Sequence, residues 1–148
     1  MKKIFLAFII SICSFNPSLA LIEVDITRGN LDPLPIAVSP LHVDIESVEI
    51  EGIKVKELGS NISSIIEKNF KNTGLFNPLK KDAFVQKPDI AHLKPRFEDW
   101  RLIKAQALVT GKLLVKDGKL KVEFRLWDLT AAKEITALAF TTTPTNWR

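Results

Sequence analysis

The dipeptide Asp117-Gly118, set between two apolar-rich runs, constrains the fold of this chain more than any other feature of its sequence. A two-residue Asp-Gly loop is typical of a tight β-hairpin, because both central residues of that turn need positive φ. It predicts two antiparallel strands, residues 107–116 and 119–128, in a fixed register. That register pairs largely apolar residues on one face: Val115 with Leu120, Leu113 with Val122, Gly111 with Phe124, and Val109 with Leu126. A slip of one residue would expose this face to water, so the turn and the hydrophobic pattern agree.

The segments around this hairpin complete a small set of elements. Residues 134–142 are predicted to form the third strand of a meander, and Ile36-Ala37-Val38 is typical of a short buried strand. Apolar residues at helical spacing predict a helix that begins between Val55 and Asn61 and ends before Gly74, which suits a left-handed cap.

A second helix is predicted from Pro95 to about Lys104, because proline is favourable at the first helical position. Phe97 and Trp100 share one face of it, which makes Trp100 a core residue. The order of elements predicts an α+β, two-layer domain over residues 36–148. In it, two helices pack on one face of a small mixed sheet with a C-terminal three-strand meander.

The first 20 residues have the pattern of a secretory signal peptide. Two lysines follow Met1, an apolar run of about 12 residues comes next, and small residues precede a predicted cleavage between Ala20 and Leu21. A bilayer span needs about 20 apolar residues, so no membrane insertion is expected after processing; an uncleaved anchor is the alternative. The only cysteine, Cys13, lies in this leader, so the processed chain needs no disulfide.

Charge and residue usage exclude several classes of function. The formal net charge of +4 falls to +2 when Lys2 and Lys3 are removed with the leader, and no basic stripe remains, so nucleic acid is not an expected partner. His42 and His92 stand 50 residues apart and are interpreted as isolated surface histidines, so no metal or other cofactor is expected.

No catalytic constellation is apparent either. The neighbouring carboxylates Glu98 and Asp99 suit the dipole of their helix better than acid–base chemistry. Ser63 and Ser64 lack a nucleophile-elbow context and are interpreted as small residues that permit close packing. Trp127 falls on the polar face of its strand, where a neighbouring helix or the remainder of a larger protein could cover it. The sequence therefore predicts a protein that is not an enzyme.

The segment after the leader is the candidate binding site. Residues 21–35 combine a strip of alternating apolar and polar residues with a Gly- and Pro-containing linker. The strip consists of Leu21, Ile22, Glu23, Val24, Asp25, Ile26 and Thr27, and the linker begins with Arg28 and Gly29. Two interpretations are open: an ordinary first strand of the sheet, or an arm that adds a strand to the sheet edge of a partner.

Several short motifs resemble those of a known family in order and spacing. They are Ile22-Glu23-Val24-Asp25-Ile26-Thr27-Arg28-Gly29, Asp32-Pro33-Leu34-Pro35-Ile36-Ala37-Val38, Asn72-Thr73-Gly74-Leu75-Phe76-Asn77-Pro78, Phe97-Glu98-Asp99-Trp100-Arg101, Val109-Thr110-Gly111, Phe124-Arg125-Leu126-Trp127-Asp128 and Asn146-Trp147-Arg148. Together they resemble the N-terminal domain of the TolB family, over nearly the whole chain after the leader.

The resemblance implies a periplasmic, non-enzymatic scaffold of the Tol–Pal system that maintains outer-membrane integrity and aids envelope constriction at division. It also implies that residues 21–35, and residues 21–29 within them, contact the periplasmic domain of TolA. Contacts with Pal and colicins belong to the family's β-propeller. This sequence stops at Trp147-Arg148, ahead of that propeller, so Pal binding is not expected of it.

Two other classes of function remain open alongside this one. A stand-alone periplasmic adaptor domain, of the kind found in outer-membrane lipoproteins and secretion systems, would have a similar outline, as would a non-functional fragment. A small secreted enzyme would need a convergent polar pocket, for which the sequence offers no obvious residues.

Overall fold

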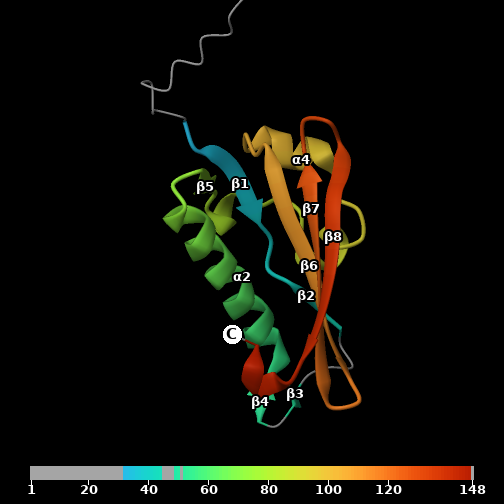
Figure 1. Ribbon diagram of the computed structural model, residues 1–148. Coiled ribbons are helices and arrows are strands. Elements are labelled where there is room, and N and C mark those ends of the chain that lie inside the picture. The colour runs from blue at the N-terminus through green and yellow to red at the C-terminus, as the bar shows by residue number, and fades with distance from the viewer. Residues whose placement is uncertain (1–31, 45–48, 51, 148) are drawn as a thin grey trace, which may run out of the picture. The chain divides into compact units, whose positions relative to one another are not determined.

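The computed structural model describes residues 32–44, 49–50 and 52–147 of the 148-residue chain. In this part a six-stranded mixed sheet has the order β5-β1-β6-β7-β8, with β2 also paired to β6 (Figure 1). Its strands are β1 (Leu34–Val38), β2 (His42–Val43), β5 (Phe76–Pro78), β6 (Ala107–Lys116), β7 (Lys119–Asp128) and β8 (Lys133–Thr142). A separate two-stranded sheet consists of β3 (Glu49–Ile50) and β4 (Ile53–Lys54).

The helical elements are α2 (Val55–Asn72), α3 (Pro88–Ala91), α4 (Phe97–Leu102) and the short 3-10 helices η1 (Lys81–Ala83) and η2 (Pro144–Asn146). Among the residues that the structure describes, no helix has the length and apolar character needed to cross a membrane. The predicted α+β class and the mixed sheet are confirmed, since β1 runs parallel to β5 and β6 while β6, β7 and β8 form an antiparallel meander.

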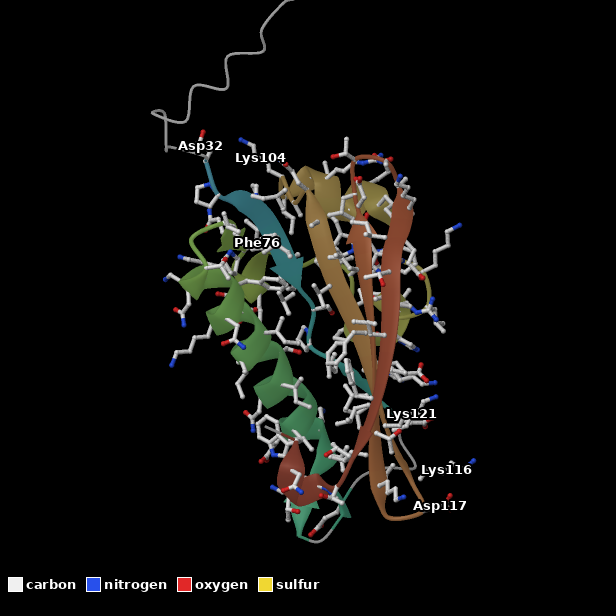
Figure 2. All side chains as sticks on the ribbon, viewed as in Figure 1. Asp32, Phe76, Lys104, Lys116, Asp117 and Lys121 are labelled. Atoms are coloured by element: carbon white, nitrogen blue, oxygen red, sulfur yellow. The ribbon has the colours of Figure 1, made fainter. Side chains whose placement is uncertain are left out.

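The hairpin has the register that its turn predicts. Asp117 has φ 51° and Gly118 φ 70°, as a two-residue turn of this kind requires. All four predicted pairs on the apolar face are present, from Val109↔Leu126 to Val115↔Leu120. Lys116 and Asp117 lie at the end of the hairpin that is remote from Lys104 (Figure 2).

The first helix agrees with its prediction, whereas the second begins later than predicted. α2 begins at Val55, ends at Asn72 and is followed by Gly74 with φ +71°. α4 begins at Phe97, and Pro95 lies before the helix. Arg96 is extended and caps the start of the helix, and its N–H donates to Oε1 of Gln86 at 2.9 Å.

The two predicted helices pack on opposite faces of the sheet, so the expectation of one shared face is wrong. Ile36 and Val38 of β1 pack with Ile66 and Phe70 of α2 on one face. Ala37, between them in sequence, packs with Trp100 of α4 on the other. β1 and the start of β6 are apolar on both faces, as is usual for a strand covered on both sides. Layers of helix therefore flank the sheet on two sides.

β1 begins two residues earlier than the predicted domain boundary at residue 36. The N–H of Leu34 donates to the carbonyl of Leu75, and the N–H of Gln106 to the carbonyl of Pro35, both at 2.9 Å. The last two residues of the predicted arm are thus part of an interior strand of the sheet.

Candidate interaction surfaces

The residues expected to bind a partner precede the described part of the chain. Ala20 and residues 21–29 all lie outside the described residues, as does the predicted cleavage site. Asp32, exposed at the head of β1, is the first residue that the structure describes (Figure 2). The structure therefore tests neither interpretation of the strip, but it shows that the chain that follows it enters an interior strand.

His42 and His92 are stacked, so their interpretation as isolated residues is wrong. Their ring centroids are 4.2 Å apart and the planes differ by 3°. Burial, and then the neighbouring His92, lower the pKa of His42 below its ordinary value of 6.5. Pairing of β2 with β6 and the position of α3 bring the two rings together, and neither is visible as a local sequence pattern. In the described part of the chain no three His, Cys, Asp or Glu side chains form a group that could hold a metal ion.

Trp100 of α4 and Trp127 of β7 have structural roles. Trp100 is 1% exposed and donates from Nε1 to Oε1 of Gln86 at 2.9 Å. Trp127 is 7% exposed and donates to Oγ1 of Thr110 at 2.9 Å. Phe97 of α4 meets the Trp127 ring at an edge, with 6.0 Å between centroids, so a neighbouring helix covers this side chain. Neither indole is placed to stack on a ligand.

The adjacent carboxylates of α4 also have structural partners. Glu98 pairs with Arg101 at 2.6 Å, and Asp99 accepts from Nε of Arg96 at 2.7 Å. The two carboxylates form ion pairs with different arginines at the surface and do not converge on one point.

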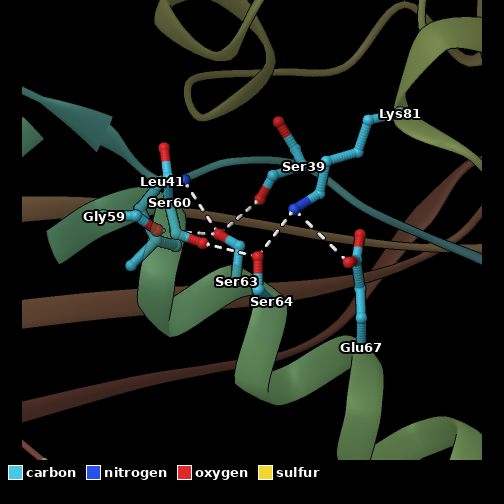
Figure 3. A network of polar contacts seen from close by, with 8 residues as sticks. All are labelled: Ser39, Leu41, Gly59, Ser60, Ser63, Ser64, Glu67 and Lys81. Carbon is cyan, nitrogen blue, oxygen red and sulfur yellow. Dashed lines mark hydrogen bonds and ion pairs between the residues drawn. The ribbon is translucent and has the colours of Figure 1, made fainter. Parts of the chain in front are cut away.

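Ser63 is the centre of a buried polar network that joins α2 to the connection between β1 and β2 (Figure 3). Its hydroxyl accepts from the N–H of Leu41 at 3.1 Å and lies 3.1 Å from the carbonyl of Ser39 and 3.0 Å from that of Gly59. The prediction of close packing is confirmed for Ser63 and is wrong for the exposed Ser64, and the sequence does not show that the Ser63 hydroxyl satisfies a buried amide. Ser64, its exposed neighbour, contacts Lys81 instead.

An apolar groove lies beside α2 on the face of the sheet that this helix covers. It has a volume of about 310 Å³. Its lining comes from α2, β6, β7 and β8: Ile66, Phe70, Val109, Phe124, Arg125, Leu126, Thr136 and Leu138. The hydrophobic pattern of the strands predicts a covered face here, yet Leu138 and Phe140 are each 54% exposed.

β8 is an open edge of the sheet among the described residues. It pairs with β7 and with no second strand in this part of the chain. Nine of its ten residues are exposed. Figure 1 shows it as the outermost strand, on the side of the sheet away from β1.

Comparison with known proteins identifies relatives of this domain. The family described as the TolB amino-terminal domain matches residues 22–135. The Tol-Pal system protein TolB of Pelagibacter ubique (strain HTCC1062) is 62% identical over 143 residues, which are 95% of this chain and 32% of that protein. The chain thus spans about a third of the length of this curated relative.

Two solved structures share the fold at low sequence identity. TolB from Acinetobacter baumannii has a TM-score of 0.58 and 14% identity, with 78% of this chain and 25% of that chain covered. The LpoB C-terminal domain from Salmonella enterica has a TM-score of 0.54 and 9% identity, with 78% and 87% covered. The alignment with the second structure extends over most of a separate domain, so this α+β unit is a fold that occurs in different protein contexts.

Proposed function

Because the chain belongs to the TolB family through its amino-terminal domain, we propose that it is a non-enzymatic periplasmic adaptor of the Tol–Pal system. In this proposal residues 1–20 are a leader that is removed on export, residues 21–35 carry the partner-binding arm, and the domain that follows is its anchor. The partner is the periplasmic domain of TolA, and the role is to maintain the outer membrane and aid envelope constriction at division.

One observation carries this proposal: the family match begins at Ile22, immediately after the predicted cleavage site between Ala20 and Leu21. The family match therefore includes the strip, which supports placing the strip in the processed protein and not in the leader. The 62% identity over 95% of the chain supports the same assignment.

The physical basis of binding would be addition of the strip as a strand to a sheet edge of the partner. Its main-chain groups would supply hydrogen bonds, and alternate side chains would supply specificity. Ile22, Val24 and Ile26 share one face of such a strand, and Glu23 and Asp25 share the other. The rigid attachment of Leu34 to the sheet gives the arm a fixed base.

Calorimetric titration of the purified chain against the TolA periplasmic domain tests the arm. Deletion of residues 21–31 should abolish binding while the Tm stays within a few degrees, because these residues precede β1. Replacing Val24 and Ile26 together with Asp should weaken binding strongly. Leu102→Asp, the same kind of apolar-to-acidic change at an exposed position of α4 outside the arm, is the matched control and should leave the affinity unchanged. Undiminished affinity after the deletion would refute the arm, and a large loss of Tm would assign the strip to the sheet.

Mass spectrometry of the protein recovered from the periplasm tests its export separately. The expected N-terminal residue is Leu21. A membrane-embedded chain that retains Met1 would contradict processing, whatever the outcome of the binding experiment.

A further inference from the structure

Beyond its first residues, the open edge of β8 has no feature that would protect it from pairing. Sheets of monomeric proteins commonly shield their edges with charged side chains, prolines, bulges or short strands. β8 is ten residues long, and residues 135–142 contain neither a charged residue nor a proline. The only charges of the strand, Lys133 and Glu134, lie at its start, and Glu134 is held by Arg125 at 2.8 Å. The register irregularity between Leu126 and Trp127 lies opposite this same end and leaves the rest of the edge regular.

The register determines which main-chain groups of β8 face outward. In a two-residue hairpin the residues that flank the turn, here Lys116 and Lys119, exchange backbone hydrogen bonds, and bonded pairs then alternate along the ladder. By this alternation Phe124 of β7 and Leu138 of β8 exchange backbone hydrogen bonds. The pairs Val122↔Phe140 and Leu126↔Thr136 do the same. The N–H and C=O groups of Ala137, Ala139 and Thr141 therefore point away from β7, toward the open side.

The same register assigns the side chains of β8 to two faces. Leu138 stands opposite Phe124, and Phe140 opposite Val122, so both large side chains lie on the α2 face, where Leu138 lines the apolar groove. Phe140 meets Phe124 edge-on, with 6.3 Å between centroids, yet remains 54% exposed. The other face of this stretch carries Ala137, Ala139 and Thr141, which are small enough to permit close approach.

We propose that β8 is a self-association edge, which pairs antiparallel with β8 of a second copy of this chain about a two-fold axis at Ala139. The strand is complementary to itself in this arrangement. Outward-facing Ala139 lies opposite its own copy, and Ala137 lies opposite Thr141, so every outward N–H and C=O of these residues has a partner. Between these hydrogen-bonded pairs, Leu138 of each copy lies opposite Phe140 of the other, so the two-fold axis produces this apolar contact twice.

A second copy fits this edge better than a charged or proline-containing segment, because the pairing buries no unpaired charge and leaves no main-chain group of residues 137–141 without a partner. It also joins two apolar faces, those of β8 beside the groove in each copy, into one surface. The inference concerns the described domain and does not depend on the proposed arm or on TolA.

Sedimentation equilibrium of the purified full chain over a range of concentrations tests the proposal. A single pair of strands buries a small area, so we expect a monomer–dimer equilibrium with Kd on the order of 10–100 µM. Phe140→Lys should weaken the dimer about tenfold or more, because the two-fold axis makes each substitution act twice and brings the new charge against an apolar partner.

Leu102→Lys is the matched control, since Leu102 is 79% exposed on α4 and away from β8. It should leave the dissociation constant unchanged. A chain that stays monomeric at several hundred micromolar, about ten times the expected Kd, would overturn the proposal. So would a dimer that responds equally to the two lysine substitutions.

Disulfide trapping gives a readout that does not depend on the lysine variants' folding. The two copies of residue 139 form a hydrogen-bonded pair, with Cα atoms about 5.5 Å apart, within the range of about 4.4–6.8 Å that a disulfide spans. With Cys13 replaced by Ser, Ala139→Cys should therefore form a covalent dimer under mild oxidation much faster than Leu102→Cys. Equal rates for the two variants would refute pairing at this edge.

Discussion

Replacing Ser63 with Ala should destabilise the domain by about 0.5–2.5 kcal/mol. The hydroxyl accepts from the buried N–H of Leu41 at 3.1 Å, and its loss leaves that donor without a partner, at about 1–3 kcal/mol. Alanine regains up to about 0.5 kcal/mol through its better helix propensity. The expected fall in Tm is roughly 2–10 °C for a domain of this size.

Ser64→Ala is the matched control, one residue along the same helix. Its exposed hydroxyl bonds the carbonyl of Ser60 at 3.0 Å and accepts from Nζ of Lys81 at 3.1 Å, and water can replace both partners. The expected change is within about 0.5 kcal/mol.

Chemical denaturation of both variants, followed by circular dichroism, measures the difference. Amide hydrogen exchange adds a local readout, because the Leu41 N–H should exchange faster in Ser63→Ala alone. Equal free energies of unfolding for the two variants would refute the assignment of Ser63 as the residue that joins α2 to the sheet.

Three further predictions concern the sheet and the histidine pair. Phe124→Ala should cost about 2–4 kcal/mol in denaturant unfolding, as its ring is half-buried on the α2 face, whereas Lys121→Ala, on the other face, should cost under about 0.5 kcal/mol; similar values would mean a different register. Gly111→Ala should cost about 1–3 kcal/mol, since a Cβ there would overlap the carbonyl oxygen of Glu123, and an unchanged Tm would contradict so close an approach. Because the pKa of His42 is lowered from 6.5, the neutral ring's contribution to the free energy of unfolding is fully present above pH 6.5 and is lost as the pH falls through the lowered pKa. His42→Gln should therefore flatten the acid side of a plot of Tm against pH. An unaltered slope would exclude His42 as the source of that pH dependence.

Local signals in the sequence were sufficient to predict the β6–β7–β8 meander and the helix α2. The Asp117-Gly118 turn determines the register of β6 and β7 by itself, and the stripe of apolar residues determines the buried face of α2. Pairings between distant segments are different, because no local pattern encodes them. The strand β5, the stack of His42 on His92 and the placement of α4 on the second face all depend on such pairings.

One feature of the sequence nevertheless indicates that both faces of the sheet are covered. Ile36-Ala37-Val38 and Ala107-Leu108-Val109 are apolar at every position, which indicates strands covered on both sides and not on one. The openness of β8 was not visible in this way, because alternating Leu138 and Phe140 look like core residues when only their own strand is considered.

The position of β1 between β5 and β6 has a consequence for the order in which the chain folds. β1 is the first strand of the described domain, yet Ile36 pairs with Pro78 of β5 on one side and with Ala107 of β6 on the other. Closing such long loops costs entropy before any contact compensates for it, whereas the β6–β7–β8 meander forms through short loops alone. During synthesis from the N-terminus, β1 can pair with β5 first, but it cannot complete its second pairing until β6 has followed. Pulsed hydrogen exchange during refolding should protect the amides of β7 before that of Ala37, and the reverse order would contradict this sequence of events.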